Sequence, residues 1–395
     1  MTAPRVAIVG SGLTGLLAAQ GLQKNGIRVV VYEKDPSLDF RQRDWTIMLH
    51  WGMSTLGKIL PQEVRDIFPQ AFCDPFYKEE YPPSLPCLGN MTGKPAFHIP
   101  STWMRLISRQ RFRRVLSHGL RIECKKKLQA LKHSSDGDGP VTMVFEDGSR
   151  HEADIIVGAD GPRSAVRTHL LGEEKSAVVN SPWVIAMTIF SYGDAEKARF
   201  VRQLHPVWHM VYGPEGIGAL AVTDAGKSND PKEWQFYFVR IWEQDLEHSI
   251  NGEEALKIFK EKSTRLCEPF RSAAEWIPEG SLCNVDQLKY WVPEPWDNRG
   301  GRVTLAGDAA HSIMPFRGQG FNRSMEDTLQ LVEAIVKIRD GADRAEAMAS
   351  YDRDVCARGR DAVLASLEEG KTNMNYERLG TSKTATRGFA KEVRL

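Results

Sequence analysis

The hydrophobic positions at the start of the chain change their spacing twice. Residues 6–9 are uninterrupted apolar positions that end at Gly10, as in a short buried strand. Leucines at positions 13–22 then recur at helical spacing, and the pattern stops before Gly26, a residue suited to a helix C-terminus. Residues 29–32 are again apolar and mostly β-branched. The pattern therefore predicts a strand, a helix and a second strand.

Two later stretches repeat the change from a buried strand to a turn and a helix. Residues 154–157 are followed by Gly-Ala-Asp-Gly and a helical pattern. A second apolar run stops at Gly307-Asp308, before a proline, two glycines and another helical pattern. Between them, residues 178–296 contain short aromatic or β-branched segments separated by turn residues, which is typical of a mixed or antiparallel sheet, and then a helical stretch.

The first turn also has the spacing of a nucleotide-binding motif. Gly10, Gly12 and Gly15 form Gly-x-Gly-x-x-Gly where the first strand meets the helix, so the backbone can approach a pyrophosphate that faces the helix N-terminus. Glu33 ends the second strand, where a carboxylate accepts hydrogen bonds from a ribose diol and disfavours a 2′-phosphate. The motif predicts bound FAD or NAD.

Composition narrows the class of partner. Lys and Arg number 52 and Asp and Glu 51, so a net charge of +1 gives no field that would attract nucleic acid or an anionic membrane, and we expect a small-molecule partner. The 6 cysteines include no Cys-x-x-Cys pair, which argues against a zinc site. No secretory pattern and no apolar run of about 18 residues is present, so we expect a cytoplasmic protein without a membrane span or a metal.

Three stretches together resemble a known family. They are the glycine motif with its strand-end Glu33, "GADGPRSAVR" and "LAGDAAHSIMPFRGQGFN", in the order and spacing of the para-hydroxybenzoate hydroxylase-like (group A, single-component) FAD-dependent aromatic hydroxylases. The versions of fungal secondary metabolism are the most similar. The resemblance implies an α/β fold with a Rossmann-like FAD-binding domain (GR2-type) and an inserted β-sheet-plus-helix substrate domain. It divides the chain into FAD-binding residues 1–177 with a substrate-side contribution near 73–100, a substrate domain at 178–296 and FAD-binding residues 297–370. Residues 371–395 have little periodicity and several Lys and Arg, so we expect a frayed C-terminal tail there, with a dimer contact as the alternative.

The resemblance also implies which residues bind FAD. In the family, the residue matched by Asp308 accepts a hydrogen bond from the ribityl chain, and the helix after Gly318 and Gly320 points its positive end at the ring edge that becomes negative on reduction. An arginine that opens a helix matches Arg109, with Arg111 as its rival, and an arginine after the ribose-binding acid matches Arg43 or Arg41. The full set of expected FAD contacts is Gly10, Gly12, Leu13, Thr14, Gly15, Glu33, Lys34, Arg43, Arg109, Asp160, Gly161, Asp308, Pro315, Gly318, Gly320, Phe321 and Asn322. Asp160 has a simpler role open to it, because a strand-end Asp can cap the following helix.

Candidates for substrate binding lie on the strands of the inserted sheet. His209, Tyr212, Tyr237 and Arg240 could face the junction with the FAD-binding domain and bind or deprotonate a phenol. Each could equally be a satisfied structural residue. His50 and His311 occur in flavin-proximal motifs but are weaker candidates, because in this family most of the chemistry belongs to the cofactor.

The activity that the resemblance implies is an NAD(P)H-consuming, FAD-dependent monooxygenase. NADPH or NADH would reduce the non-covalent FAD, O2 would form a C4a-(hydro)peroxyflavin, and one oxygen atom would enter an aromatic, phenolic or polyketide-like molecule while the other becomes water. The same scaffold can instead catalyse epoxidation, oxidative decarboxylation or Baeyer–Villiger-type oxidation. An NAD-dependent dehydrogenase and a non-catalytic flavin-binding protein are alternatives from other classes. Both a monomer and a homodimer remain open.

Overall fold

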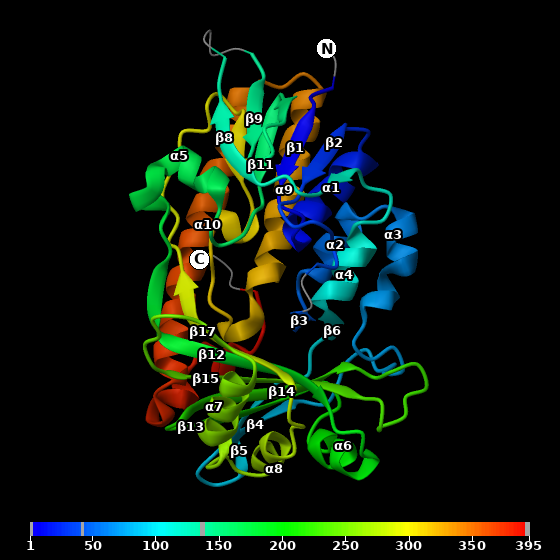
Figure 1. Cartoon of the computed structure of the whole chain (residues 1–395), viewed down its shortest axis with the longest axis vertical. Coiled ribbons are helices and arrows are strands. Elements are labelled where there is room, and N and C mark those ends of the chain that lie inside the picture. Colours follow the sequence, from blue (N-terminus) through cyan, green and yellow to red (C-terminus); the bar gives the residue numbers. More distant parts are fainter. Residues whose placement is uncertain (1–2, 41–42, 135–138, 392–395) are drawn as a thin grey trace.

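The chain folds into two parts that lie one above the other, with β1 in the upper part (Figure 1). This computed structural model describes residues 3–40, 43–134 and 139–391. The upper part is built on a parallel sheet and the lower part on an eight-stranded sheet, and the long helix α10 (Arg344–Asn373) runs beside both.

Four sheets make up the strand content of the described residues. The upper, parallel sheet has the order β18 (Val303–Leu305), β11 (Ile155–Gly158), β1 (Val6–Val9), β2 (Val29–Tyr32) and β7 (Ile122–Glu123). Beside it lie an antiparallel sheet of β10 (Arg150–Ala153), β9 (Val141–Phe145) and β8 (Leu128–Lys132), and the pair β3 (Thr46–Leu49) and β6 (Arg105–Ser108). The lower sheet has the order β16 (Ile250–Asn251), β17 (Leu282–Tyr290), β12 (Val179–Ser191), β15 (Gln235–Glu243), β14 (Gly216–Asp224), β13 (Trp208–Gly213), β4 (Leu85–Gly89) and β5 (Lys94–Ile99).

The helices cover these sheets from outside. Those of the upper part are α1 (Leu13–Lys24), α2 (Met53–Ile59), α3 (Gln62–Ile67), α4 (Arg109–Leu116), α5 (Ala165–Ser176) and α9 (Gly320–Arg339). Those of the lower sheet are α6 (Ala195–Arg202), α7 (Glu253–Ser263) and α8 (Phe270–Glu275). Short helices η1 (Phe68–Ala71), η2 (Gly307–Ala309), η3 (Phe316–Gly318), η4 (Tyr376–Thr381) and α11 (Lys383–Arg387) lie in connections and at the C-terminal end.

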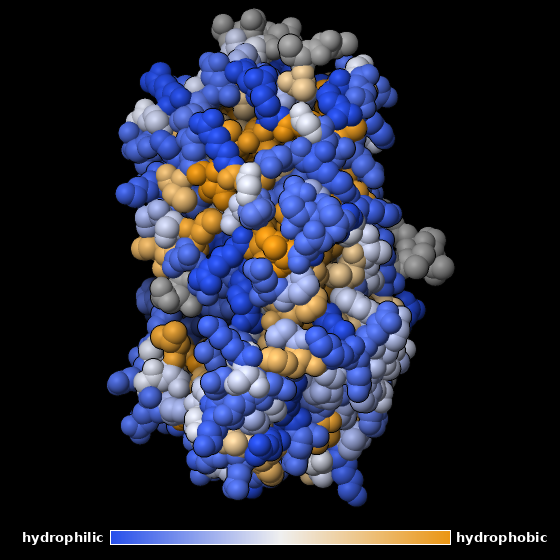
Figure 2. Space-filling view, turned by 90° about the vertical axis from the view of Figure 1, so that its right-hand side faces the viewer, coloured by the Kyte–Doolittle hydropathy of each residue, from blue (hydrophilic) through white to orange (hydrophobic). Residues whose placement is uncertain are grey.

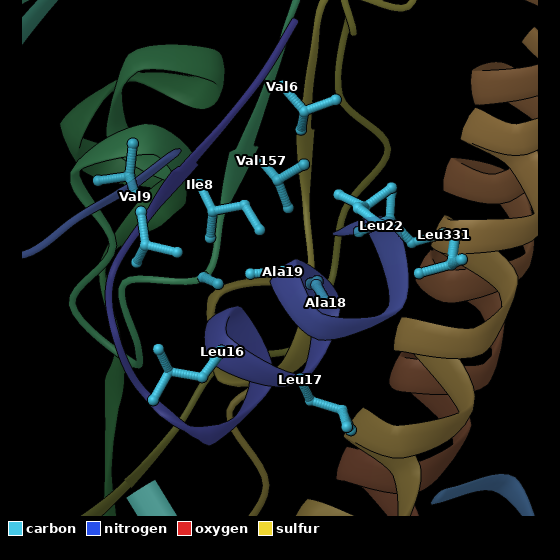
Figure 3. Close-up of a cluster of buried hydrophobic side chains, with 14 of the residues drawn as sticks. Val6, Ile8, Val9, Leu16, Leu17, Ala18, Ala19, Leu22, Val157 and Leu331 are labelled. Carbon is cyan, nitrogen blue, oxygen red and sulfur yellow. The ribbon is translucent and has the colours of Figure 1, made fainter. Parts of the chain in front are cut away.

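The predicted strand, helix and strand at the start of the chain are confirmed as β1, α1 and β2. Helix α1 is apolar on more than one side because it packs between the sheet and α9, and Figure 3 shows Leu22 of α1 next to Leu331 of α9. Leu16 and Leu17 are fully buried, and each such side chain contributes about 1.5–3 kcal/mol through burial. This packing fixes the N-terminus of α1 at the edge where β1 ends.

The lower sheet buries both of its faces, and alternate residues of a strand divide between them. On β15, Phe236 and Phe238 pack with the helices α7 and α8, whereas Tyr237 and Val239 belong to an apolar layer that faces the upper part. We call this layer the junction layer. It also contains Phe316 of η3, a residue of the upper part.

The expectation of a frayed tail at residues 371–395 is wrong for the described residues. Helix α10 continues to Asn373, and η4 and α11 follow. Leu379 and Phe389 are buried in the junction layer, with exposed fractions of 3% and 6%. Residues 392–395 lie outside the described residues.

The surface of the upper part has apolar patches among many hydrophilic residues (Figure 2). Within the described ranges, the structure contains no helix whose length and apolar character would let it cross a membrane.

Candidate functional site

The three motifs singled out in the sequence meet at one edge of the upper sheet. Strands β1, β11 and β18 are parallel neighbours, with Val9 beside Gly158 and Gly158 beside Leu305. The turns that follow these strands therefore lie together. A Cβ built on Gly10, whose φ is +105°, would come within 2.5 Å of the Ala159 carbonyl oxygen, and one built on Gly307 would come within 2.5 Å of the Thr14 hydroxyl.

Glycine is required at these contacts because the backbones touch. A Cβ on Gly15 would lie 2.1 Å from the carbonyl oxygen of Gly10, so no larger residue fits where α1 packs on the turn. Gly12 is different, since its Cβ would meet nothing closer than 3.8 Å. The space beside Gly12 is available for a group that approaches the helix N-terminus closely.

Glu33 is buried in a network that the sequence interpretation only partly anticipated. Its carboxylate accepts hydrogen bonds from the Ser11 N–H at 2.9 Å, from the Ser11 hydroxyl, and from Arg113 Nη2 at 3.2 Å. Burial alone would raise the pKa of Glu33, but the hydrogen bonds from Ser11 and Asp35 and the charge of Arg113 lower it, so the group is ionised. Arg113 was not among the candidates. It lies four residues after Arg109, one helical turn along α4.

The Asp308 carboxylate combines exposure to solvent with closely surrounding protein. Its surface is exposed to solvent, yet burial raises its pKa, against the opposing charges of His311 and Arg109. A carboxylate that water reaches while protein surrounds it closely occupies a concave position, and we call this position the recess. A polar ligand chain could bind there.

The start of α9 borders open space. A Cβ built on Gly318 or on Gly320 would meet no heavy atom within 4 Å, and among the described residues no side chain caps the helix. Its first N–H groups are therefore positioned for an anionic or electron-rich ligand. Asn322 fixes this start, because its amide Nδ2 donates to the Met48 and Gly318 carbonyls and its Oδ1 accepts from the Gly52 N–H.

The remaining expected contacts surround these turns. Leu13 is buried at the first turn of α1, Lys34 and Pro315 are exposed, and Phe321 packs edge-to-face on Phe112 at 5.9 Å. Gly161 has a φ of +83°.

Asp160 forms its hydrogen bonds within its own loop and with the start of α5. Its carboxylate accepts hydrogen bonds from the Ser164 hydroxyl and from the backbone N–H of Ala165 at 2.7 Å, so it caps α5. Buried Arg167 then joins this loop to the next motif, because it donates to the carbonyls of Pro162 and Ala309. Asp160 therefore has the capping role that the sequence left open. Its hydrogen bonds also fix the loop beside the recess.

Arg109 and Arg111, the two candidates for the FAD-binding arginine of α4, have different partners in the structure. Arg109 stacks over the Trp45 ring at 4.4 Å and is close enough to lower the pKa of Asp308. Arg111 instead forms an ion pair with Asp224 at 2.7 Å and donates to the Phe72 carbonyl. Arg109 is therefore the arginine that faces the recess.

Arg43, which follows the strand-end Glu33 in the chain, faces the lower part in this structure. It is exposed and forms an ion pair at 2.9 Å with Asp286 of β17, on the lower sheet. The ion pair directs the Arg43 guanidinium toward the junction layer, close to Tyr237. Arg41, the rival of Arg43, lies outside the described residues.

Two of the four substrate candidates point away from the upper part. His209 is 1% exposed and packs on Phe270 of α8. Arg240 is fully buried and donates to the carbonyls of Ile217 and Lys262 on the helical side of the sheet. The expectation that they line the junction is corrected, because strand alternation places both on the opposite face.

Tyr212 and Tyr237 do lie in the junction layer, together with Phe316. Burial raises the pKa of both phenols above the ordinary value, so they are neutral and can donate or accept a hydrogen bond but cannot act as bases at neutral pH. The charge of Arg43 is near enough to oppose the rise at Tyr237. The sequence pattern could not have separated them from His209, because both sheet faces are buried.

These features fit an FAD molecule. The open space beside Gly12, Gly318 and Gly320, the ionised Glu33 and the accessible Asp308 supply a backbone cradle for phosphate and acceptors for hydroxyl groups. Their positions follow the edge of one parallel sheet, where such ligands bind in α/β folds.

Comparison with known proteins agrees with this geometry. Residues 106–366 match the model of a family described as "FAD binding domain", and residues 8–69 match a "NAD(P)-binding Rossmann-like domain". The chain is 33% identical to the FAD-dependent monooxygenase phnB of Penicillium herquei, covering 98% of this chain and 96% of that one. It is 30% identical to the FAD-dependent monooxygenase cctM of Talaromyces islandicus, with 98% and 96% covered.

A solved structure shares the fold. The 2,6-dihydroxypyridine-3-hydroxylase of Arthrobacter nicotinovorans superimposes with a TM-score of 0.76 at 20% identity, covering 94% of this chain and 93% of that chain. The predicted α/β architecture with a Rossmann-like domain is confirmed. This chain therefore belongs to the FAD-binding-domain family and is an FAD-dependent monooxygenase of the para-hydroxybenzoate hydroxylase-like type.

Proposed function

We propose that the protein uses NADPH or NADH to insert one oxygen atom of O2 into an aromatic, phenolic or polyketide-like small molecule. One observation carries the proposal: the aromatic face of the lower sheet and the turn that borders the recess belong to the same apolar layer. Tyr212, Tyr237 and Phe316 all contribute to it. A flat, largely apolar substrate held there would be enclosed by protein on the side away from the flavin.

We further propose that residues 178–296 form the substrate domain and that residues 1–177 and 297–370 form the FAD-binding domain. The FAD contacts would be Gly10, Gly12, Leu13, Thr14, Gly15, Glu33, Lys34, Arg109, Asp160, Gly161, Asp308, Pro315, Gly318, Gly320, Phe321 and Asn322. When bound, the flavin would supply the redox chemistry, taking electrons from NAD(P)H and passing them to O2.

The chain's own residues would bind, orient and shield. The N-terminus of α9 would stabilise negative charge at the nearby ring edge through its unpaired N–H groups. Tyr237 would hydrogen-bond a substrate oxygen as a neutral phenol, next to the positive charge of Arg43. The relative named for 2,6-dihydroxypyridine, an aromatic substrate, supports this class.

Anaerobic reduction of the bound flavin tests the proposal. Reduction by NADPH and by NADH would be followed at the flavin's visible absorbance band, with and without phenols, quinones, polyketides and alkaloids. We expect one class to accelerate reduction and to be oxygenated when air is admitted. The chemical identity of that product also separates hydroxylation from epoxidation, oxidative decarboxylation and Baeyer–Villiger-type oxidation. A flavin-loaded protein that neither NADPH nor NADH reduces with any ligand would contradict the proposal and favour a non-catalytic flavin-binding protein.

A further inference from the structure

The C-terminal residues 376–391 form an arm that crosses between the two parts of the molecule (Figure 1). At its beginning, Tyr376 covers β4, since a Cβ on Gly89 would lie 2.4 Å from the Tyr376 hydroxyl. Leu379 packs in the junction layer. The arm therefore lies on the sheet face that contains Tyr212 and Tyr237.

A buried carboxylate holds the middle of the arm. Glu369 of α10 is 3% exposed and accepts hydrogen bonds from the backbone N–H groups of Lys383 at 2.9 Å and Thr384 at 2.8 Å, and from the Thr384 hydroxyl. Burying a carboxylate is costly unless it is hydrogen-bonded, so these bonds give the arm a defined position.

The end of the arm is bound to the turn that borders the recess. Arg317 precedes Gly318 and is 8% exposed. Its Nη2 donates to the carbonyl of Gly388 at 3.1 Å and to that of Ala390 at 3.1 Å. Arg317 has a φ of +68°, an uncommon conformation for a residue with a side chain, and here it aims the guanidinium at the arm.

Between these two carbonyls lies Phe389. Its ring centroid is 5.6 Å from that of His50, and His50 Nε2 is 3.3 Å from the Gly318 carbonyl oxygen, at the start of α9. Lys391, the last residue of the arm, forms an ion pair at 2.9 Å with Glu326 of α9. A large apolar side chain is thereby fixed beside the proposed position of the flavin ring.

We propose that the C-terminal arm is a wall of the reaction chamber, in which Phe389 shields the flavin ring from water and Arg317 is the positioning residue that holds it. The inference rests on the proposed function, because it places the ring beside Gly318 and Gly320. Such a wall would favour oxygen transfer to the substrate over loss of the oxygen as H2O2, which consumes the two electrons of NADPH without forming product.

The test uses the full chain loaded with FAD, in wild-type form and as Phe389→Ala. Phe76→Ala is the matched control, because that ring is 40% exposed in a loop. One readout is quenching of the bound flavin's fluorescence by iodide. The other is the rate at which the photoreduced enzyme returns to the oxidised form in aerated buffer without substrate. We expect Phe389→Ala to increase both about tenfold and Phe76→Ala to match the wild type.

Variants of Arg317 test whether this residue positions Phe389 or only contributes to packing. Arg317→Met should increase iodide quenching as Phe389→Ala does, Arg317→Lys should restore part of the protection, and the double variant should be no worse than Phe389→Ala. Trypsin cleavage after Arg387 should accelerate in Arg317→Met and in Lys391→Ala. The wild-type Lys391 side chain is 46% exposed, so its replacement leaves no buried space unfilled. If Phe389→Ala does not fold, Phe389→Leu and Lys391→Ala decide the question by the same readouts.

The outcomes distinguish this inference from the proposed function. Unchanged quenching and reoxidation in Phe389→Ala or, failing that, in Phe389→Leu and Lys391→Ala would overturn the inference, even if the wild type forms product. A wild-type protein that binds FAD but does not oxygenate any substrate would overturn the proposed function, whereas the iodide result would still report whether the arm covers the ring.

Discussion

The imidazole Nε2 of His311 lies 2.5 Å from a carboxylate oxygen of Asp327, and both side chains are buried. Arg358 of α10 donates to the other oxygen at 3.0 Å. Burial would lower the pKa of His311, but Asp327 raises it. Burial would raise the pKa of Asp327, but His311 and Arg358 lower it. The three charges join the segment that follows η2 to α9 and α10.

Asp327→Asn should lower the free energy of unfolding by about 3–5 kcal/mol, because it leaves two buried cations without their partner. The matched control is Asp354→Asn, which removes a 39% exposed partner of Arg358 and should cost about 1 kcal/mol at most. Urea unfolding of both variants measures the difference. Equal losses would mean that the network is not a determinant of stability.

The same network predicts a dependence on pH. The folded pKa of Asp327 is depressed, so its contribution is present above the unfolded value of about 3.9 and is lost as the pH falls through the folded value. The folded pKa of His311 is raised, so its contribution is complete below about 6.5 and is lost as the pH rises through the folded value. Unfolding measured from acidic to alkaline pH should show both losses in the wild type, and Asp327→Asn should make each of them smaller.

Gly320→Ala should weaken FAD binding while leaving the FAD-free protein as stable as the wild type. The protein itself leaves the space beside Gly320 open, so only a ligand would meet the new methyl group. Gly57→Ala, in the interior of α2 with no atom within 4 Å of its Cβ, should gain about 0.5–1 kcal/mol and bind FAD normally. Fluorescence titration and urea unfolding measure the two effects. Unaltered FAD affinity in Gly320→Ala would argue against close approach of the flavin.

Arg109→Gln should weaken FAD binding about tenfold, equivalent to about 1.4 kcal/mol, because the lost charge faces the recess of Asp308. Arg111→Gln should leave FAD affinity within about twofold and lower stability instead, since Arg111 pairs with Asp224. Titration of both apoproteins with FAD compares them directly. The reverse order of affinities would restore Arg111 as the cofactor-binding arginine.

His209→Leu should keep FAD binding and oxygenation, because His209 faces the helices of the lower part. Burial lowers its pKa to about 3, so in acid the unfolded chain takes up the proton first and the folded protein loses stability as the pH falls below about 6.5. Replacement with leucine should remove up to about 1.4 kcal/mol of this loss per pH unit, as unfolding at about pH 6 and pH 4 would show. Loss of oxygenation in a folded variant would return His209 to the reaction.

The convergence of the three glycine-rich turns could be predicted from sequence, because each follows a strand and parallel strands end at a common edge. The orientation of the lower sheet could not. Tyr212 lies three residues after His209 and Arg240 three after Tyr237, so each pair divides between opposite faces. With apolar residues on both faces, nothing in the pattern indicates which one meets the upper part.

The burial of the C-terminal arm could not be predicted from the sequence either. Its apolar anchors Leu379 and Phe389 are too far apart to form a helical or strand pattern, and their partners Tyr376 and Arg317 act through isolated contacts. Arg113 was missed for a different reason: the rotation of α4 decides which of its arginines reaches Glu33.

Helix α10 connects the two parts along one side of the molecule. Its 30 residues span about 45 Å, and it is joined to the upper part by Arg358 and packed on Trp183 of the lower sheet at Gly370, where a Cβ would approach within 2.7 Å. A continuous helix of this length behaves as a stiff rod. It therefore holds the lower sheet and the upper part at a fixed spacing along this side of the molecule.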